Sequence, residues 1–176
     1  MNQMVYVENI ISEDERKILY DWIIENKDGD MYVWSKHPGT IRRTTRFTDR
    51  VVYPDIAYKI KDRIQTEFNL KSVKEPPYPS GMVATYGYPG DWCELHQDPS
   101  WYEDCITYHC IVLLSDIEHG GLSIIADQEV QLQPRDCILY PVSEIPHGST
   151  KLNGNTPRLL WIFGYCVPLT EIDKIS

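Results

Sequence analysis

Two segments near the start of the chain repeat their apolar side chains with the period of an α-helix. Ser12 and Glu15 have the spacing of a capping box, in which each side chain accepts a hydrogen bond from the backbone of the other. The pattern predicts one helix that begins at Ser12 and ends between residues 26 and 29, and a second that spans 55–68. The expected apolar faces are Ile18, Leu19, Trp22 and Ile23 in the first helix, and Ile56, Ile60, Ile64 and Phe68 in the second.

The region after residue 81 has a different pattern, with short runs of β-branched and aromatic residues between Gly, Pro, Asn and Asp. Residues 119–121 and 134–136 carry turn signals. Between the two helices, 31–52 is expected to be extended and irregular, and the prolines of 74–81 disfavour any regular structure there. The strand candidates are 82–88, 106–114, 122–126, 129–133, 137–140 and 158–166.

Chain length and strand spacing together indicate the fold class. A chain of 176 residues with ordinary globular composition is long enough to form one domain with its own core. Short strands at this spacing favour an antiparallel sandwich or barrel. We therefore expect a single domain over 1–176, in which 1–80 is a helical support region and 81–167 is the β core.

Composition argues against several classes of function. The net charge of −9 repels polyanions, so no nucleic-acid partner is expected. The clustered cations of 42–46, followed by Arg50, are either solvated and ion-paired or face a substrate. The longest apolar run is far shorter than the ~20 residues that a membrane-spanning helix needs, so no membrane association is expected.

The cysteines indicate a reducing environment. There are five, an odd number, with no C-x-x-C pair, and the first eleven residues lack the pattern of a signal peptide. We expect a cytoplasmic protein with free thiols that are mostly buried as small apolar groups. The five are Cys93, Cys105, Cys110, Cys137 and Cys166.

Two histidines and an aspartate are the strongest candidates for chemistry. His96 and Asp98 are two positions apart, so on a strand both side chains point to the same face. His147 can complete a set of two imidazoles and one carboxylate, which is the ligand set of non-haem Fe(II) sites with open positions. An H-x-D pair alone arises often by chance, and the order of the surrounding motifs is what favours this interpretation. His109 lies inside an apolar strand candidate and points either into such a cavity or away from it.

In sequence order, these features resemble the Fe(II)/2-oxoglutarate-dependent dioxygenases, especially the prolyl-4-hydroxylase-like branch. The resemblance covers most of the chain and is strongest over 82–164. It rests on Tyr86–Tyr88, His96-Gln97-Asp98, Gly120-Gly121-Leu122, Asp136–Pro141, His147, Gly154, Arg158 and Trp161. The family fold is a double-stranded β-helix, a cupin-like jelly roll. The resemblance thus implies a mainly β protein with two N-terminal helices packed on one sheet.

The resemblance also implies the centre of the site. His96, Asp98 and His147 would hold Fe(II) as the catalytic metal. Arg158 would bind the distal carboxylate of 2-oxoglutarate, because a planar guanidinium offers a carboxylate two parallel donors.

One part of the implied cosubstrate site departs from the family pattern. Many members have Ser or Thr two residues after the arginine, where this chain has Leu160. Tyr86, Thr107 or Ser123 would then complete the carboxylate pocket, and Tyr86 is expected to bind the cosubstrate through its hydroxyl.

The implied chemistry is hydroxylation of a protein side chain, such as proline, or of a small molecule. Fe(II), 2-oxoglutarate and O₂ would take part, with ascorbate in a supporting role. Halogenases of the superfamily typically lack the carboxylate ligand, so Asp98 favours hydroxylation. Gly164 stands where nucleic-acid demethylases usually carry a second arginine, which disfavours that activity.

Parts of the substrate site, and two other functions, remain open. Trp92 and Trp101 either form an aromatic rim over the metal or pack against the sheet, and Arg43 and Arg46 would pair with an acidic region of a substrate. One alternative function is a cupin-type metalloenzyme that does not use 2-oxoglutarate, in which Arg158 would have no role. The other is a non-catalytic β-sandwich binding module. The substrate and the oligomeric state are left undetermined by the sequence.

Overall fold

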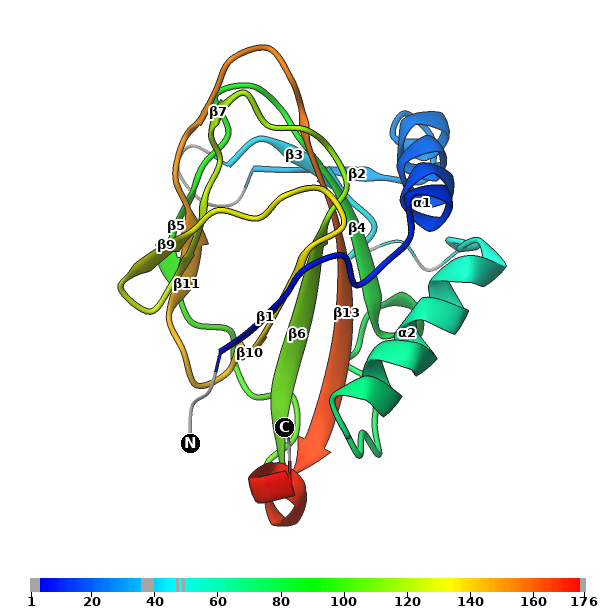
Figure 1. The fold of residues 1–176 in the computed structure, drawn as a ribbon, viewed down its shortest axis with the longest axis vertical. Coiled ribbons are helices and arrows are strands. Elements are labelled where there is room, and N and C mark those ends of the chain that lie inside the picture. The colour runs from blue at the N-terminus through cyan, green and yellow to red at the C-terminus, as the bar shows by residue number, and fades with distance from the viewer. Residues whose placement is uncertain (1–3, 36–39, 47, 49, 175–176) are drawn as a thin grey trace.

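The computed structural model describes residues 4–35, 40–46, 48 and 50–174 (Figure 1). Its helices are α1 (Glu13–Asn26) and α2 (Asp55–Glu67), with short 3-10 segments η1 (Pro79–Gly81) and η2 (Leu169–Lys174). The strands in chain order are β1 (Val5–Val7), β2 (Tyr32–Trp34), β3 (Arg42–Thr44), β4 (Met82–Gly87), β5 (Cys93–His96), β6 (Cys105–Leu113), β7 (His119–Gly120), β8 (Ser123–Ile125), β9 (Gln128–Val130), β10 (Cys137–Pro141), β11 (His147–Ser149), β12 (Leu152–Asn153) and β13 (Arg158–Pro168).

Helix α1 forms where the capping box predicts it. The backbone amide of Glu15 donates to Ser12 Oγ at 3.2 Å, and the amide of Ser12 donates to the Glu15 carboxylate at 2.8 Å. Leu19 and Ile23 are fully buried, as the apolar period predicts. Ile18 is 47% exposed, so its assignment to the buried face is wrong.

Helix α2 also confirms the prediction. It follows Pro54, whose fixed φ suits the entry to a helix. Ile60, Ile64 and Phe68 are buried at the expected spacing of four. Both helices contribute to one apolar cluster with the strands, so the support region and the β core share that cluster.

The strands form two main antiparallel sheets. The large sheet has the order β1-β10-β6-β13-β4-β3-β2, the smaller one has the order β5-β11-β8-β9, and β7 pairs with β12. Figure 1 shows both helices on one side of the large sheet and the smaller sheet on the other side. The expected fold class, a mainly β jelly roll with two N-terminal helices on one sheet, is confirmed.

The central strand β13 separates two apolar clusters. Leu159, Trp161 and Phe163 point toward the helices and are buried among their apolar side chains. Leu160 and Ile162 point the other way, into the space between the sheets. Successive residues of a strand face opposite sides, so one strand serves both clusters.

The connections contain more regular structure than the sequence pattern indicates. Strands β2 and β3 lie within 31–52, of which residues 36–39, 47 and 49 are outside the described part. Segment 74–81 includes η1, and Lys74 bridges to Cys166 on β13. The segments at His119 and His147 form β7 and β11 instead of a turn and a connection. These strands are two or three residues long, which is too short for a period of two to be recognised.

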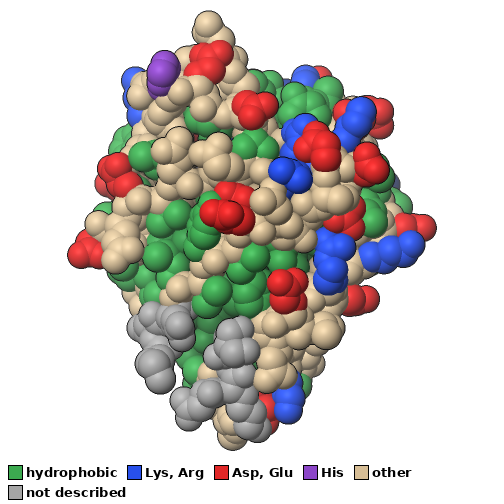
Figure 2. Space-filling view, in the orientation of Figure 1, with side chains coloured by type: hydrophobic (Ala, Val, Ile, Leu, Met, Phe, Trp, Pro, Cys, Tyr) green, Lys and Arg blue, Asp and Glu red, His purple; other side chains and the backbone are tan. Residues whose placement is uncertain are grey.

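The outer surface carries mixed charge. On the face shown in Figure 2, the Lys and Arg side chains lie among Asp and Glu. Ion pairs at the protein surface include Lys17–Asp21 and Lys74–Asp104. Within the described part of the chain, neither helix combines the length and the apolar character needed to cross a membrane.

Candidate metal centre

A cavity of about 410 Å³ lies between the two main sheets. The large sheet contributes apolar side chains to its wall, among them Val83, Ile111 and Ile162. The smaller sheet contributes residues of β5, β8 and β11. Charged and metal-binding side chains from both sheets and from the adjoining loops line the same space, so the apolar wall surrounds polar chemistry.

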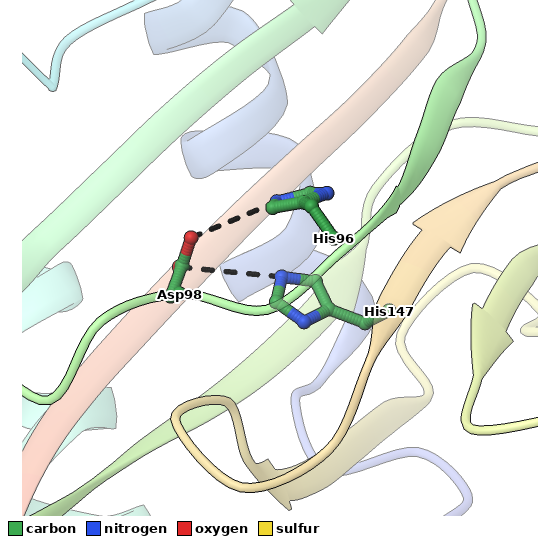
Figure 3. A group of neighbouring side chains, drawn as sticks. All are labelled: His96, Asp98 and His147. Carbon is green, nitrogen blue, oxygen red and sulfur yellow. Dashed lines mark ion pairs between the residues drawn. The ribbon is translucent and has the colours of Figure 1, made fainter.

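Two histidines and one aspartate meet in this cavity (Figure 3). Asp98 Oδ1 is 3.6 Å from His96 Nε2, and Asp98 Oδ2 is 4.0 Å from His147 Nε2. One possible ligand atom from each residue lies within 4.8 Å of the others. Ligands at about 2.1 Å from a common ion lie roughly 3 Å apart, so small side-chain rotations would complete a metal site.

Strand pairing explains how the three residues come together. His96 ends β5, His147 begins β11, and the two are register partners whose ring centroids are 4.4 Å apart. Asp98 lies two residues beyond the end of β5. The expectation that His96 and Asp98 share a strand face is therefore wrong, and the chain leaving β5 turns the carboxylate toward both rings.

Backbone carbonyl groups fix the orientation of both imidazoles. His96 Nδ1 is 2.9 Å from the carbonyl oxygen of Glu94, and His147 Nδ1 is 3.2 Å from that of Ile145. A carbonyl oxygen can only accept, so each Nδ1 carries the hydrogen. Each Nε2 is then left with a lone pair on the side of Asp98, which is the tautomer that metal binding through Nε2 requires.

Burial and neighbouring charges keep two of these groups in the metal-binding form. Burial lowers the pKa of His147 to about 4, so its ring is neutral at physiological pH. Burial alone would raise the pKa of Asp98, but the nearby His109 and Arg46 help to lower it below the ordinary value. At neutral pH a metal ion would meet a neutral imidazole and an ionised carboxylate.

Cys93 is a further neighbour of the candidate ligands. Its Sγ lies 3.7 Å from His96 Nδ1 and 3.7 Å from Arg42 Nη2. The contact with Cys93 raises the pKa of His96, against the effect of burial. A metal at His96 would therefore compete with a proton more strongly than at His147.

A second part of the cavity contains a buried guanidinium. Arg158 opens β13 and donates from Nη2 to Ser123 Oγ at 2.8 Å, while its Nε is buried with no hydrogen-bond partner. Burial, and then repulsion from Arg42, lower the pKa of Arg158 to about 10, which still leaves it charged at neutral pH. A buried cation is costly unless it is paired. An anionic ligand would supply the missing partner.

Gly87 creates the space for two neighbouring arginines. It pairs with Arg158 on β13 and with Arg42 on β3, so the three residues form one row across the sheet. A Cβ at position 87 would lie 3.5 Å from Arg158 Cβ and 3.1 Å from Asp91 Oδ2. Glycine therefore keeps the region beside the Arg158 side chain open.

Ser123 is the one of the three candidate pocket residues that contacts Arg158. Tyr86 packs against the cluster on the helix side of the sheet and lies outside the described cavity lining, so the fold does not bring it together with Arg158. Thr107 is fully buried and lies outside the described cavity lining. Thr85, the neighbour of Tyr86, faces the cavity instead. Alternate residues of a strand point to the same face, so knowing which residues of β4 point inward would have identified Thr85.

The basic run divides between the cavity and the outer side of the sheet. Arg42 and Arg46 line the cavity. Arg43 points to the other face, where Nε donates to Tyr88 Oη at 2.7 Å and Nη2 lies 3.3 Å from Asp28 Oδ1. Arg43 is therefore paired with neighbouring side chains, and the substrate-facing role stays a prediction for the two arginines that line the cavity.

The aromatic residues and His109 also divide by position. Trp101 and Trp34 line the cavity, whereas Trp92 lies outside its described lining. His109 faces the cavity, and its Nε2 is 2.7 Å from Tyr78 Oη. Tyr78 had no sequence signal, because it belongs to the proline-rich segment with no period of its own.

No protein-family model matches this sequence, and no curated protein matches it. Solved structures do match its fold. A prolyl-4-hydroxylase of Pseudomonas putida has a TM-score of 0.69 at 11% identity, over 96% of this chain and 94% of that chain. The viral collagen prolyl hydroxylase vCPH of Paramecium bursaria Chlorella virus-1, in its 2OG complex, has a TM-score of 0.68 at 13% identity, over 94% and 96%. HygX of Streptomyces hygroscopicus, with nickel and 2-oxoglutarate bound, has a TM-score of 0.66 at 16% identity, over 96% and 84%.

At these identities the likeness establishes the fold alone. The chain has the jelly-roll fold of prolyl-4-hydroxylases and other 2-oxoglutarate-binding proteins, over nearly its whole length. The resemblance to the prolyl-4-hydroxylase-like branch is therefore confirmed at the level of the fold. Function has to be argued from the site itself.

Proposed function

We propose that this protein is a non-haem Fe(II)- and 2-oxoglutarate-dependent dioxygenase that hydroxylates a protein side chain, such as proline, or a small molecule. One observation carries the proposal. A cluster of two histidines and one aspartate shares a single cavity with a buried guanidinium that donates to a serine hydroxyl. The first group suits a divalent metal, and the second suits the far carboxylate of a dicarboxylate.

His96, Asp98 and His147 fit Fe(II) as ligands. Their donors are two imidazole nitrogens and one carboxylate oxygen, and the backbone already fixes the tautomer of both rings. When bound, Fe(II) with 2-oxoglutarate supplies the capacity to activate O₂ for hydroxylation of a C–H bond. A supporting role for ascorbate belongs to the same proposal.

Arg158 and Ser123 orient the cosubstrate. The guanidinium would form paired hydrogen bonds with the distal carboxylate, and the Ser123 hydroxyl would add a third contact. Leu160 and Ile162 line the cavity from the same strand as Arg158. These apolar side chains exclude water, which strengthens the interactions of the charged groups.

Anaerobic titration of the metal-free protein tests the proposal. Fe(II) followed by 2-oxoglutarate should produce a weak visible charge-transfer band that requires both additions. His96→Ala and Asp98→Ala should abolish the band, and Arg158→Ala should raise the 2-oxoglutarate concentration it needs by at least about tenfold. His119→Ala and Arg43→Ala are matched controls, because both residues lie outside the cavity lining, and they should leave the band unchanged.

Other outcomes would favour the alternatives. Metal binding with no band, together with O₂ consumption that does not depend on 2-oxoglutarate, would favour a cupin-type metalloenzyme. Failure to bind any divalent metal would favour a non-catalytic binding module. Either result would refute the proposal.

A cytoplasmic location is part of the same proposal. The five cysteines are buried and free in the structure. Free thiols are typical of a reducing compartment. Fractionation of cells that express the full chain would test this assignment.

A further inference from the structure

Arg46 is a cation of the cavity that the proposed chemistry does not use. It lies two residues after the end of β3 and lines the cavity. Continuing the register of β3 on β4 places position 46 beside Val83, four residues from Gly87 and its row of arginines. Four residues of strand span about 13 Å. Arg46 therefore reaches a different part of the cavity from Arg158.

The neighbours of Arg46 place it beside the candidate metal centre. It lines the same cavity as His96, Asp98 and His147. Its guanidinium carbon lies 5.9 Å from the ring centroid of Trp34 and 5.6 Å from that of Tyr78. Contacts with two aromatic rings thus restrict the position of the guanidinium in the cavity, without any bound substrate.

No carboxylate among the described residues forms an ion pair with Arg46. Arginine ion pairs in this part of the chain involve Arg16, Arg43, Arg63 and Arg135. Asp98 shares the cavity with Arg46, and a bound metal would take up that carboxylate charge. The cavity group His109 is neutral at physiological pH, because burial lowers its pKa to about 3. The positive charge of Arg46 is therefore left for a ligand.

We propose that Arg46 binds an anionic group, a carboxylate or a phosphate, of the primary substrate. This inference rests on the function proposed above and names the substrate class for that site. An acidic protein with a net charge of −9 gains no attraction for anions from its overall field. Binding of an anionic substrate would therefore have to come from a specific contact, and the inward-facing Arg46 offers one. The Trp34 and Trp101 rings would contact an apolar or aromatic part of the same substrate.

The test uses a carboxylate and a neutral amide of nearly the same shape, together with a phosphate on the same ring. Phenylacetate, phenylacetamide and phenyl phosphate would be titrated calorimetrically into the protein loaded with Zn(II) and saturating 2-oxoglutarate. At least one of the two anions should bind about tenfold or more tightly than the neutral amide, as expected for a charge-assisted hydrogen bond. Comparison of phenylacetate with phenyl phosphate distinguishes a carboxylate site from a phosphate site.

Variants assign the preference to one side chain. R46Q should abolish the preference for the anion, and R46K should retain part of it, because lysine keeps the charge but loses the planar fork. R43Q is the matched control, since Arg43 belongs to the same run but faces Tyr88 and Asp28, and it should leave the preference unchanged. Thermal unfolding of each variant verifies that the fold is intact. If R46Q does not fold, R46K and the wild-type probe series still decide the question.

Three results would overturn the inference: equal or undetectable binding of the anions and the amide, a preference that survives R46Q, or a loss in R46Q that affects 2-oxoglutarate instead of the probe. The last result would assign Arg46 to the cosubstrate. The two proposals fail in distinguishable ways. A wild type that binds no metal and no 2-oxoglutarate would refute the proposed function, whereas a wild type that binds both without preferring an anion would refute this inference alone.

Discussion

The two faces of the seven-stranded sheet differ in what their side chains contact. Toward the helices, Leu159, Trp161 and Phe163 are fully buried in an apolar cluster. Toward the smaller sheet, Leu160 and Ile162 border a cavity that also contains charged groups. Alternation along a single strand thus separates residues packed in the apolar cluster from residues that border the cavity.

The difference shows where the fold tolerates unfavourable groups. The cavity side contains the guanidinium groups of Arg42, Arg46 and Arg158, together with the candidate metal centre. Buried charges without partners destabilise a protein. Close apolar packing on the helix side offsets this cost. Mutations on the helix side should therefore mainly reduce stability, whereas mutations on the cavity side should have smaller effects on stability and should also affect ligand binding.

Removal of Trp161 should have the largest effect on stability. Its ring lies 5.3 Å from that of Tyr53 and 5.4 Å from that of Trp22, and the side chain is fully buried. Trp161→Ala should lower the free energy of unfolding by about 3–5 kcal/mol, measured by urea denaturation with EDTA present. Tyr32→Ala, at a side chain that is 55% exposed, is the control and should change it by less than about 0.5 kcal/mol. A loss below about 1 kcal/mol for Trp161→Ala would contradict the assigned role of the helix side.

Acid should reveal a weakness of the cavity side. Burial lowers the pKa of His109 to about 3 from an ordinary 6.5, so the unfolded chain binds more protons between these values. Stability should therefore fall as the pH falls from 6.5 toward 3, by on the order of 4 kcal/mol from this residue. His109→Gln should flatten the dependence in urea denaturation of the metal-free protein, whereas His119→Gln, at an exposed ring, should not. An unchanged slope in His109→Gln would show that other groups control acid unfolding.

The sequence predicted the long elements of this fold because their periods extend over several turns or residues. The capping box and the spacing of Ile60, Ile64 and Phe68 identified both helices. The strands β6 and β13 are nine and eleven residues long, and both were recognised. Strands β2, β3, β5 and β11 have three or four residues, so pairing with neighbours rather than local preference defines them.

The sequence identified the residues of the candidate metal centre, but it did not predict how the strands bring them together. His96, Asp98 and His147 were found by motif, but the register that joins β5 to β11 was not visible in the sequence. The side of the sheet that Tyr86 occupies was not visible in the sequence either, because a shift of one residue along a strand reverses every side chain. The inward position of Arg46 depends on the pairing of β3, which likewise leaves no local signal.

A matched pair of leucines sharpens the comparison of the two faces. Leu159 and Leu160 are adjacent on β13, and both are buried, but Leu160 borders the cavity. Leu159→Ala should cost about 3–4 kcal/mol in the free energy of unfolding, and Leu160→Ala about 2 kcal/mol, since a side chain beside a cavity has fewer contacts to lose. Urea denaturation of both variants under identical conditions measures the difference. Equal costs would mean that the cavity wall is packed as closely as the helix side.

Replacement of Arg158 should separate stability from ligand binding, with the smallest effect on the former. Arg158→Met removes a buried cation whose Nε has no hydrogen-bond partner, and the apolar side chain retains much of the same volume. We expect the metal-free variant to be more stable than wild type by about 1 kcal/mol, while the visible band that requires both Fe(II) and 2-oxoglutarate should need at least about tenfold more 2-oxoglutarate. The control, Arg43→Met, breaks a partly buried hydrogen bond to Tyr88 and an ion pair with Asp28, and it should keep the band at slightly reduced stability. If Arg158→Met is instead destabilised by more than about 1 kcal/mol, the guanidinium connects the two sheets through Ser123. The cavity side would then contribute to stability as the helix side does.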